Sequence, residues 1–226
     1  MYTAIFLDLD DTIFSFEKCG RAALKAACAA CRIPYGEEVF AVFQRIDDPL
    51  WDRQKKGELS VSQVLEIRAC QFTSAFDRPE MNGLFRDSFT ENLSLQAETE
   101  PFALEALHRL SQTFRIYAAS NGILKMQTAR LKKAGLLDFF SGLYVSDDIG
   151  YEKPDARFFS ECIKRCGTPA REILMVGDSL PADVAGAARS GIDCCWYNPR
   201  RQKLPRDYTP KYVIQNLLQL CELLEK

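Results

Sequence analysis

Short apolar runs recur along the chain, and each ends at polar residues or at glycine. They are rich in Val, Ile, Phe and Tyr and cover residues 4–9, 114–119, 143–145, 173–176 and 192–197. Continuous apolar runs of this length are typical of strands that are buried on both faces, as in parallel sheets. We therefore expect these runs to form the strands of a parallel sheet.

Helical patterns alternate with most of the predicted strands. They cover residues 101–111, 124–134, 156–166 and 181–190, and the last three are followed by the helix-ending glycines Gly135, Gly167 and Gly191. A regular succession of strand and helix is the pattern of an α/β protein with crossover connections. The predicted fold is a doubly wound, Rossmann-like α/β domain.

The interval between the first strand and Pro101 breaks this succession. It holds helical patterns near residues 17–32, 37–46, 60–76 and 80–93, separated by Pro34, the Asp48-Pro49 pair, Gly57 and Pro79. We expect residues 15–96 to form an inserted helical domain, with residues 1–14 and 97–226 forming the α/β core. The insertion follows the carboxyl end of a strand, where open α/β sheets bind ligands, so we interpret it as a cap. A helical domain without a functional role is the alternative.

Composition narrows the class of protein. The chain has 226 residues, 47% hydrophobic and 27% charged, with a formal net charge of −2, and these values are typical of a compact globular protein. The one basic cluster, residues 200–203, is more typical of a solvated loop than of a nucleic-acid surface, so no nucleic-acid polymer is expected as a partner. No apolar stretch approaches the roughly 20 residues of a membrane span, and residues 3–7 lack the features of a signal peptide. We expect a cytoplasmic protein without membrane association.

Cysteine and histidine do not supply the predicted chemistry. The nine cysteines are an odd number in a chain without an export signal, which favours reduced thiols. Cys28 and Cys31 have CxxC spacing but no second pair, so zinc is not expected. The only histidine, His108, falls within a helical pattern. Chemistry must therefore depend on carboxylates, lysine and hydroxyl groups.

Candidate chemical groups follow four of the predicted strands. Asp8 and Asp10 end the first run, two residues apart, so that their side chains can lean to the same side. The groups after later runs are Ser120 and Asn121, which we expect to bind the substrate, then Lys153, then Asp178 and Asp183. Taken singly, each of these later groups is more typical of a turn, a solvated loop or a helix cap. Their appearance at successive strand ends, where parallel strands bring their side chains to one edge, predicts a single site.

This ordered set resembles the haloacid dehalogenase superfamily, whose phosphatases combine a strand ending in DxD with a later Ser or Thr, a Lys and an acidic pair. The resemblance covers the whole chain and includes the position of the helical cap. It implies that Asp8 is the nucleophile, that Asp10 is the general acid and base, and that Ser120 and Lys153 bind phosphate. It also implies that Asp178 is a metal ligand and that Asp183 supports the lysine or a metal-bound water. One frequent form of the motif has Gly where this chain has Asp11, to which we assign no role.

The charges of these groups predict a divalent cation. Asp8, Asp10, Asp178 and Asp183 carry four negative charges against one positive charge on Lys153, so a phosphate dianion would be repelled. A cation bound by oxygen ligands offsets most of that charge, and a phosphate site favours Mg²⁺. We expect Asp8, Asp10 and Asp178 to hold the ion. The predicted reaction is Mg²⁺-dependent hydrolysis of a phosphomonoester through an aspartyl phosphate.

The cap sequence suggests a substrate class. Residues 48–51, Asp-Pro-Leu-Trp, followed by Gly57, resemble the cap of the pyrimidine 5′-nucleotidases of this superfamily, and residues 195–198 add to the likeness. The resemblance implies a nucleoside monophosphate as substrate, with Trp51 either stacked on the base or packed in the cap core. A phosphatase for a sugar phosphate or phosphoglycolate, a dehalogenase, and a receiver-type phosphoacceptor module are the alternatives. The receiver is disfavoured because its phosphorylated Asp ends a middle strand, where this chain has Ser120. Oligomeric state stays open.

Overall fold

The computed structural model describes residues 1–225 and divides into two compact units, which we treat separately. One unit comprises Met1–Ser15 with Glu98–Lys226, and the other comprises Phe16–Ala97. The two crossings between them lie side by side in the first unit, because Ser15 N donates to Glu98 O and Glu100 N donates to Ile13 O. The second unit is thus an insertion in the first.

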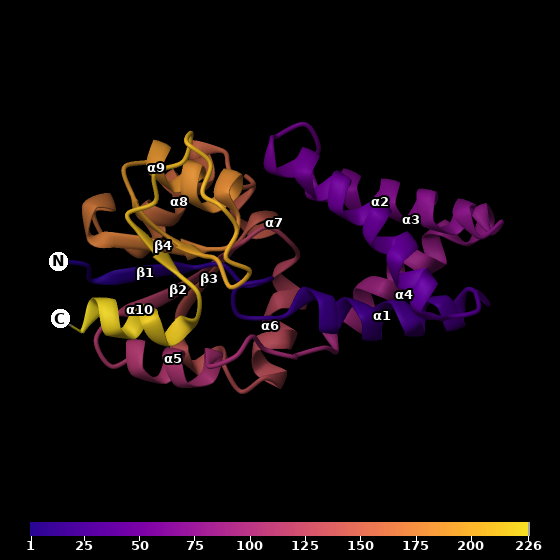
Figure 1. Ribbon diagram of the computed structural model, residues 1–226, viewed down its shortest axis with the longest axis horizontal. Helices are drawn as coiled ribbons and strands as arrows, with labels where there is room; N and C mark the ends of the chain where they lie inside the picture. The colour runs from indigo at the N-terminus through magenta and orange to yellow at the C-terminus, as the bar shows by residue number, and fades with distance from the viewer. Residues whose placement is uncertain (226) are drawn as a thin grey trace. The chain divides into compact units, whose positions relative to one another are not determined.

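The first unit is built on a six-stranded sheet in which every strand pairing is parallel, with the order β3-β2-β1-β4-β5-β6 (Figure 1). The strands are β1 Ala4–Leu7, β2 Arg115–Ser120, β3 Phe140–Val145, β4 Ile173–Gly177, β5 Asp193–Tyr197 and β6 Tyr212–Ile214. The five predicted strands are confirmed, and β6 was not predicted. All four residues of β1 are buried, as expected for a central strand covered on both faces.

Helices cover the two faces of this sheet. They are α5 Ala103–Leu110, α6 Leu124–Lys133, α7 Ser146–Ile149, α8 Ala156–Cys166, α9 Gly186–Arg189 and α10 Leu217–Leu224. Figure 1 shows α8 and α9 on one face and α5 and α10 on the other. Phe6, Tyr117 and Tyr144 pack with Phe158 and Phe159 on the α8 face, which fixes that layer. The predicted doubly wound α/β fold is confirmed.

The helix predicted over residues 181–190 begins differently from an ordinary α-helix. Leu180–Ala185 form a π-helical turn, which α9 continues. Ser179 caps this turn by accepting a hydrogen bond from Ala182 N at 3.2 Å. This wide turn follows directly on β4 and carries Asp183 back toward the end of the strand.

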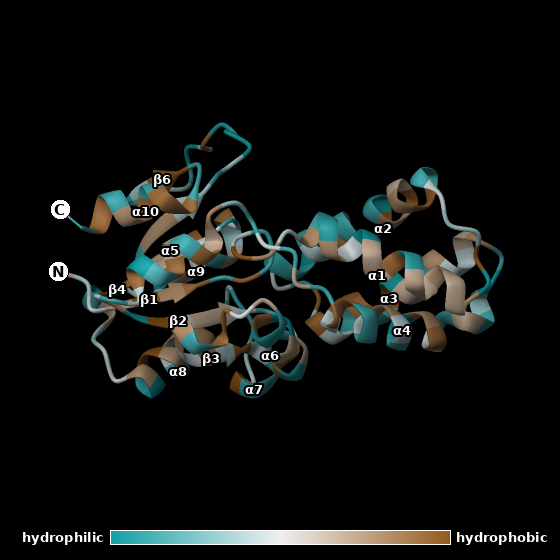
Figure 2. Cartoon of the chain, turned by 90° about the horizontal axis from the view of Figure 1, so that it is seen from below, coloured by the Kyte–Doolittle hydropathy of each residue, from teal (hydrophilic) through white to brown (hydrophobic). Residues whose placement is uncertain are grey.

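The inserted unit consists of helices. They are α1 Phe16–Ala30, α2 Glu37–Lys55, α3 Val61–Ala75 and α4 Asn82–Ser94, with a short 3₁₀ turn at Pro79–Met81. Figure 2 shows hydrophobic and hydrophilic residues alternating along these helices. Phe43, Phe72, Phe85 and Phe89 form an aromatic core between them, in which the Phe43 and Phe72 rings meet edge to face and the other pairs are stacked. Among residues 1–225, no helix is long and apolar enough to cross a membrane.

One boundary prediction in this unit was wrong. We expected the second helix to stop at residue 46, before Asp48-Pro49, but α2 continues through Pro49 to Lys55. Pro49 removes one backbone donor and its ring crowds the carbonyl of Arg45, at a cost of about 3 kcal/mol. The buried side chains Asp47, Leu50 and Gln54 continue the helical spacing beyond that point, and their packing outweighs the local cost of the proline.

Candidate active site

The predicted chemical groups lie at the carboxyl edge of the sheet. β1 pairs with β2 on one side and with β4 on the other, and Leu7 lies opposite Ala118 and Val176. Asp8 therefore follows the central strand, while Ser120 ends β2 and Asp178 follows β4 directly. Asp8 N donates to Val176 O at 2.9 Å, which holds the residue beside the end of β4.

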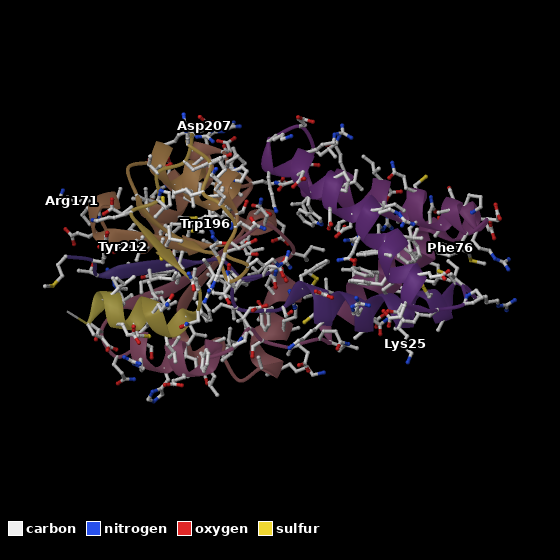
Figure 3. The ribbon with its side chains drawn as sticks, in the orientation of Figure 1. Lys25, Phe76, Arg171, Trp196, Asp207 and Tyr212 are labelled. Atoms are coloured by element: carbon white, nitrogen blue, oxygen red, sulfur yellow. The ribbon has the colours of Figure 1, made fainter. Side chains whose placement is uncertain are left out.

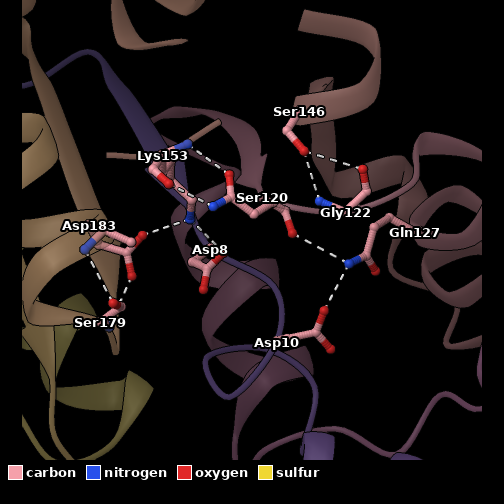
Figure 4. Close-up of polar contacts among 11 residues, drawn as sticks. Asp8, Asp10, Ser120, Gly122, Gln127, Ser146, Lys153, Ser179 and Asp183 are labelled. Atoms are coloured by element: carbon pink, nitrogen blue, oxygen red, sulfur yellow. Dashed lines mark hydrogen bonds and ion pairs between the residues drawn. The ribbon is translucent and has the colours of Figure 1, made fainter. Parts of the chain in front are cut away.

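A chain of buried charges connects three of these groups (Figure 4). Lys153 Nζ lies 2.8 Å from Asp8 Oδ1 and 2.6 Å from Asp183 Oδ1. The second oxygen of Asp183 accepts a hydrogen bond from Ser179 N at 3.0 Å. Lys153 and Asp183 are buried, and Asp8 is 8% exposed. The lysine is held between two carboxylates, and Asp8 is the one that retains some access to solvent.

This environment shifts the ionisation of both partners. Burial raises the pKa of Asp8 to about 7; the Lys153 ammonium opposes the shift, and the Asp183 and Asp10 charges add to it. Burial works to lower the pKa of Lys153, but the Asp183 and Asp8 carboxylates outweigh it, so its pKa is above its usual range. Lys153 therefore stays cationic at neutral pH. Asp8 needs positive charge in addition to that of Lys153 to ionise fully.

A close approach of backbone and side chain fixes Asp183. A Cβ added at Gly177 would lie 2.2 Å from Asp183 Oδ2. Only glycine at the end of β4 allows the carboxylate to occupy this position.

Asn121 and Ser146 position the loops around the site. Asn121 Oδ1 accepts from Lys153 N, and Asn121 Nδ2 donates to Lys153 O, both at 2.8 Å. Gly122 N donates to Ser146 Oγ at 3.0 Å. We predicted Asn121 as a substrate-binding residue, and the structure shows its side chain binding the backbone of Lys153. Its role toward substrate stays a prediction.

The Asp10 carboxylate is bound by two side chains of helix α6. Arg130 Nη1 lies 2.7 Å from Asp10 Oδ1, and Gln127 Nε2 donates to Asp10 Oδ2 at 2.8 Å. The neighbouring Asp11 has a φ of 57°, in the left-handed region that Gly and Asp tolerate best. This conformation explains how Asp can stand where the family motif often has Gly.

The acidic residues whose carboxylate oxygens lie within 4.8 Å of one another, among residues 1–225, are Asp8, Asp178 and Asp183. This group contains two of the three predicted metal ligands and has Asp183 in the place of Asp10. Trp196 of β5 supports it by donating its indole N–H to Asp178 O at 2.9 Å. Figure 3 shows Trp196 within the α/β unit.

Sequence reasoning missed Gln127, Arg130 and Ser146. Gln127 and Arg130 occupy inward-facing positions of α6 where the helical pattern calls for apolar residues, and both are completely buried. Polar residues at core positions of the helix that follows Ser120 were the available signal.

Trp51 belongs to the inserted unit. It packs against a small apolar cluster of Leu50, Leu59 and Val64 and donates its indole N–H to Asp47 Oδ1 at 3.1 Å. Packing within the inserted unit therefore buries part of the Trp51 ring, and a contact between this ring and a nucleotide base stays a prediction.

Comparison with known proteins identifies the family. Residues 2–191 match the model of the haloacid dehalogenase-like hydrolases, so the chain belongs to this family. It is 27% identical to the pyrimidine 5′-nucleotidase YjjG of Escherichia coli, over 98% of this chain and 97% of that protein. It is also 27% identical to the pyrimidine 5′-nucleotidase PynA of Streptococcus pneumoniae, over 100% of this chain and 96% of the relative.

A solved structure supports the same conclusion for the fold. The crystal structure of the HAD-hydrolase YfnB from Bacillus subtilis bound to magnesium matches with a TM-score of 0.93 and 28% identity, covering 100% of this chain and 99% of that one. The predicted resemblance to this superfamily, with likeness to its pyrimidine 5′-nucleotidases, is confirmed.

Proposed function

We propose that this protein is a Mg²⁺-dependent phosphomonoester hydrolase that acts through an aspartyl phosphate on Asp8, with pyrimidine nucleoside 5′-monophosphates as its substrates. The observation that carries the proposal is the position of the Asp8 carboxylate at the end of the central strand, 2.8 Å from the buried Lys153 ammonium. Membership of the hydrolase family and full-length similarity to two pyrimidine 5′-nucleotidases support the reaction and the substrate class.

The proposed reaction has two half-reactions. An Asp8 carboxylate oxygen forms a bond to phosphorus while the bond from phosphorus to the ester oxygen breaks, and Asp10 gives that oxygen a proton. Asp10 then takes a proton from water as the water oxygen attacks phosphorus and the bond to Asp8 breaks. Lys153 and the Ser120 hydroxyl bind the non-bridging phosphate oxygens during both steps.

The donor set fits a divalent cation. Three carboxylates converge within 4.8 Å, and the buried Lys153 is the cation that the structure pairs with two of them. Both oxygens of Asp183 already accept hydrogen bonds, so Asp8 and Asp178 are the side chains that we expect to hold Mg²⁺, with Asp183 in support. The ion would offset the negative charge of the nucleophile and the phosphate. A metal-binding role for Asp10 stays a prediction.

We assign the inserted helical unit the role of a cap that selects the leaving group. The motifs of the α/β unit account for the phosphate chemistry and leave the rest of the substrate undefined. Trp51 is the proposed platform for the base, since half-buried aromatic rings combine a fixed position with an accessible face. Its bond to the buried Asp47 restrains the plane of the indole ring.

A substrate panel tests the proposal. With Mg²⁺, phosphate release is compared for UMP, dUMP, dTMP, the purine monophosphates, sugar phosphates and phosphoglycolate, and chloride release is followed from 2-chloropropionate. We expect faster turnover of the pyrimidine nucleotides than of the other esters. Equal turnover of all esters would refute the nucleotide assignment, and chloride release without phosphate release would refute the phosphatase. A single, non-catalytic transfer from an acyl phosphate would indicate a receiver-type phosphoacceptor.

A further inference from the structure

Helix α6 presents two buried polar side chains, Gln127 and Arg130, to the site. Arg130 Nη1 donates to Asp10 Oδ1 at 2.7 Å and to Gln127 Oε1 at 3.0 Å. Gln127 Nε2 donates to Asp10 Oδ2 at 2.8 Å and to Ser120 Oγ at 3.3 Å (Figure 4). One helix therefore connects the proposed acid and base to the proposed phosphate-binding hydroxyl.

Burying the polar groups of Arg130 and Gln127 costs free energy unless they find hydrogen-bonding partners. Arg130 and Gln127 are both 0% exposed, and an isolated guanidinium or amide is strongly disfavoured in such a place. The Arg130 guanidinium lies 4.3 Å from the centre of the Phe14 ring, at the far end of the loop that carries Asp10. That loop is closed by hydrogen bonds from Asp11 N to Phe14 O and from Phe14 N to Leu9 O. Arg130 thus contacts this loop at two points, the Asp10 carboxylate and the Phe14 ring.

The direction of the hydrogen bonds determines what Ser120 can do. An amide nitrogen only donates, so Ser120 Oγ accepts from Gln127 Nε2. The serine proton is then directed elsewhere and is available to donate to a phosphate oxygen. Gln127 Oε1 accepts from Arg130, and this contact sets the orientation of the amide.

We propose that Arg130 and Gln127 are positioning residues for the reaction, a proposal that rests on the proposed function of this site. Arg130 and Gln127 hold the Asp10 carboxylate in the state that forms when its proton has passed to the ester oxygen, and Gln127 orients Ser120 as a donor. Negative charge develops on Asp10 as that proton leaves, and contacts that strengthen with this charge lower the barrier of the first half-reaction. Each Asp10 oxygen keeps a second lone pair, which can take the proton from water in the second half-reaction.

A pair of matched esters separates this role from a structural one. Phenyl phosphate and p-nitrophenyl phosphate are similar in size, but the nitrophenolate is a much more stable anion and needs little proton donation. In the Arg130→Met variant, we expect kcat/KM to fall about 100-fold for phenyl phosphate and less than about 10-fold for p-nitrophenyl phosphate. Arg130→Lys should recover part of the loss. Lys132→Met, an exposed position on the same helix, should leave both values unchanged.

Gln127→Met should behave differently. Because it frees the Ser120 hydroxyl as well as Asp10, kcat/KM should fall for both esters, with an increase in KM that Arg130→Met does not show. A double-mutant cycle completes the test: in an Asp10→Asn background, Arg130→Met should cost less than about 3-fold.

Equal falls for the two esters in Arg130→Met, or full additivity with Asp10→Asn, would overturn the proposal. Wild-type protein that releases phosphate neither from these two esters nor from any nucleotide of the substrate panel would instead refute the phosphatase. In that event the double-mutant cycle is measured by urea unfolding instead of by activity. Additive shifts of the unfolding midpoint for Asp10→Asn and Arg130→Met would still refute a coupling between Arg130 and Asp10.

Discussion

Gly177→Ala introduces a single methyl group next to the buried Asp183 carboxylate. The new Cβ would lie 2.2 Å from Asp183 Oδ2, 2.4 Å from its Cγ and 2.9 Å from its Cβ. The Asp183 side chain is completely buried and bound at both oxygens, so it has no alternative position that keeps its contacts with Lys153 and Ser179. The carboxylate must therefore move and break at least one of these bonds.

The cost follows from these contacts. Forcing a methyl group into a packed interior costs about 1–3 kcal/mol. Leaving a buried hydrogen-bonding group without its partner costs about 1–3 kcal/mol more. We expect a loss of about 2–6 kcal/mol in the free energy of unfolding. Turnover should fall about 100-fold, because a displacement of about 1 Å at Asp183 is passed to Lys153.

Urea unfolding followed by circular dichroism and the hydrolysis of p-nitrophenyl phosphate measure the two effects. Gly83→Ala is the control, since its Cβ would meet nothing within 4 Å. Gly83 lies in helix α4, where alanine should raise the free energy of unfolding by at most about 0.5–1 kcal/mol. Combining Gly177→Ala with Asp183→Ala removes the closest clashing atoms, so the alanine should then cost much less than in the wild-type background. Wild-type stability and turnover in Gly177→Ala would refute this account of the site.

Three further predictions concern the nucleophile, the cation and the helical unit. Asp8→Asn should lower kcat at least about 10³-fold, and EDTA should abolish turnover until Mg²⁺ is restored; activity that survives either treatment would contradict the mechanism. Burial raises the pKa of Asp8 to about 7. The folded metal-free protein therefore keeps a proton on Asp8 that the unfolded chain releases near pH 4. The stability that this bound proton contributes is lost as pH rises through about 7. Because Mg²⁺ needs the carboxylate form, its addition should raise Tm more at pH 8 than at pH 5.5, and an equal rise at both values would refute the assignment of Asp8 as a ligand. Arg68→Met leaves Asp47 buried without the partner that lies 3.0 Å away, so urea unfolding should show a loss of about 3–5 kcal/mol, reduced when Asp47→Asn is added; an unchanged midpoint would contradict this.

The sequence was most informative where local pattern and topology agree. Apolar runs that end in polar residues mark the strands, and parallel strands bring their carboxyl ends together. The sequence alone therefore predicts that Asp8, Ser120, Lys153 and Asp178 lie at one edge of the sheet. β6 was missed because it has three residues, of which only Ile214 is buried. A strand this short has no periodicity that separates it from a loop.

The rest of the site depends on contacts between residues distant in sequence. Arg130 and Asp10 are separated by 120 positions, and the helix that carries Arg130 gives no local sign of which acid it meets. The extension of α2 past Pro49 has a similar cause, because the ion pair of Asp47 with Arg68 on α3 adds packing that local propensity does not include. Contacts between distant residues therefore determine the partner of Asp10 and the length of α2, which the local sequence pattern does not predict.

The central claim is that Asp8 becomes phosphorylated during turnover, and chemical trapping tests it most directly. Protein quenched in acid during steady-state hydrolysis is treated with borohydride, which reduces an aspartyl phosphate to homoserine, and the peptide containing residues 1–18 is sequenced by mass spectrometry. The account predicts homoserine at position 8, dependent on both substrate and Mg²⁺. Modification at another residue, or an unmodified Asp8 in protein that is releasing phosphate, would contradict it.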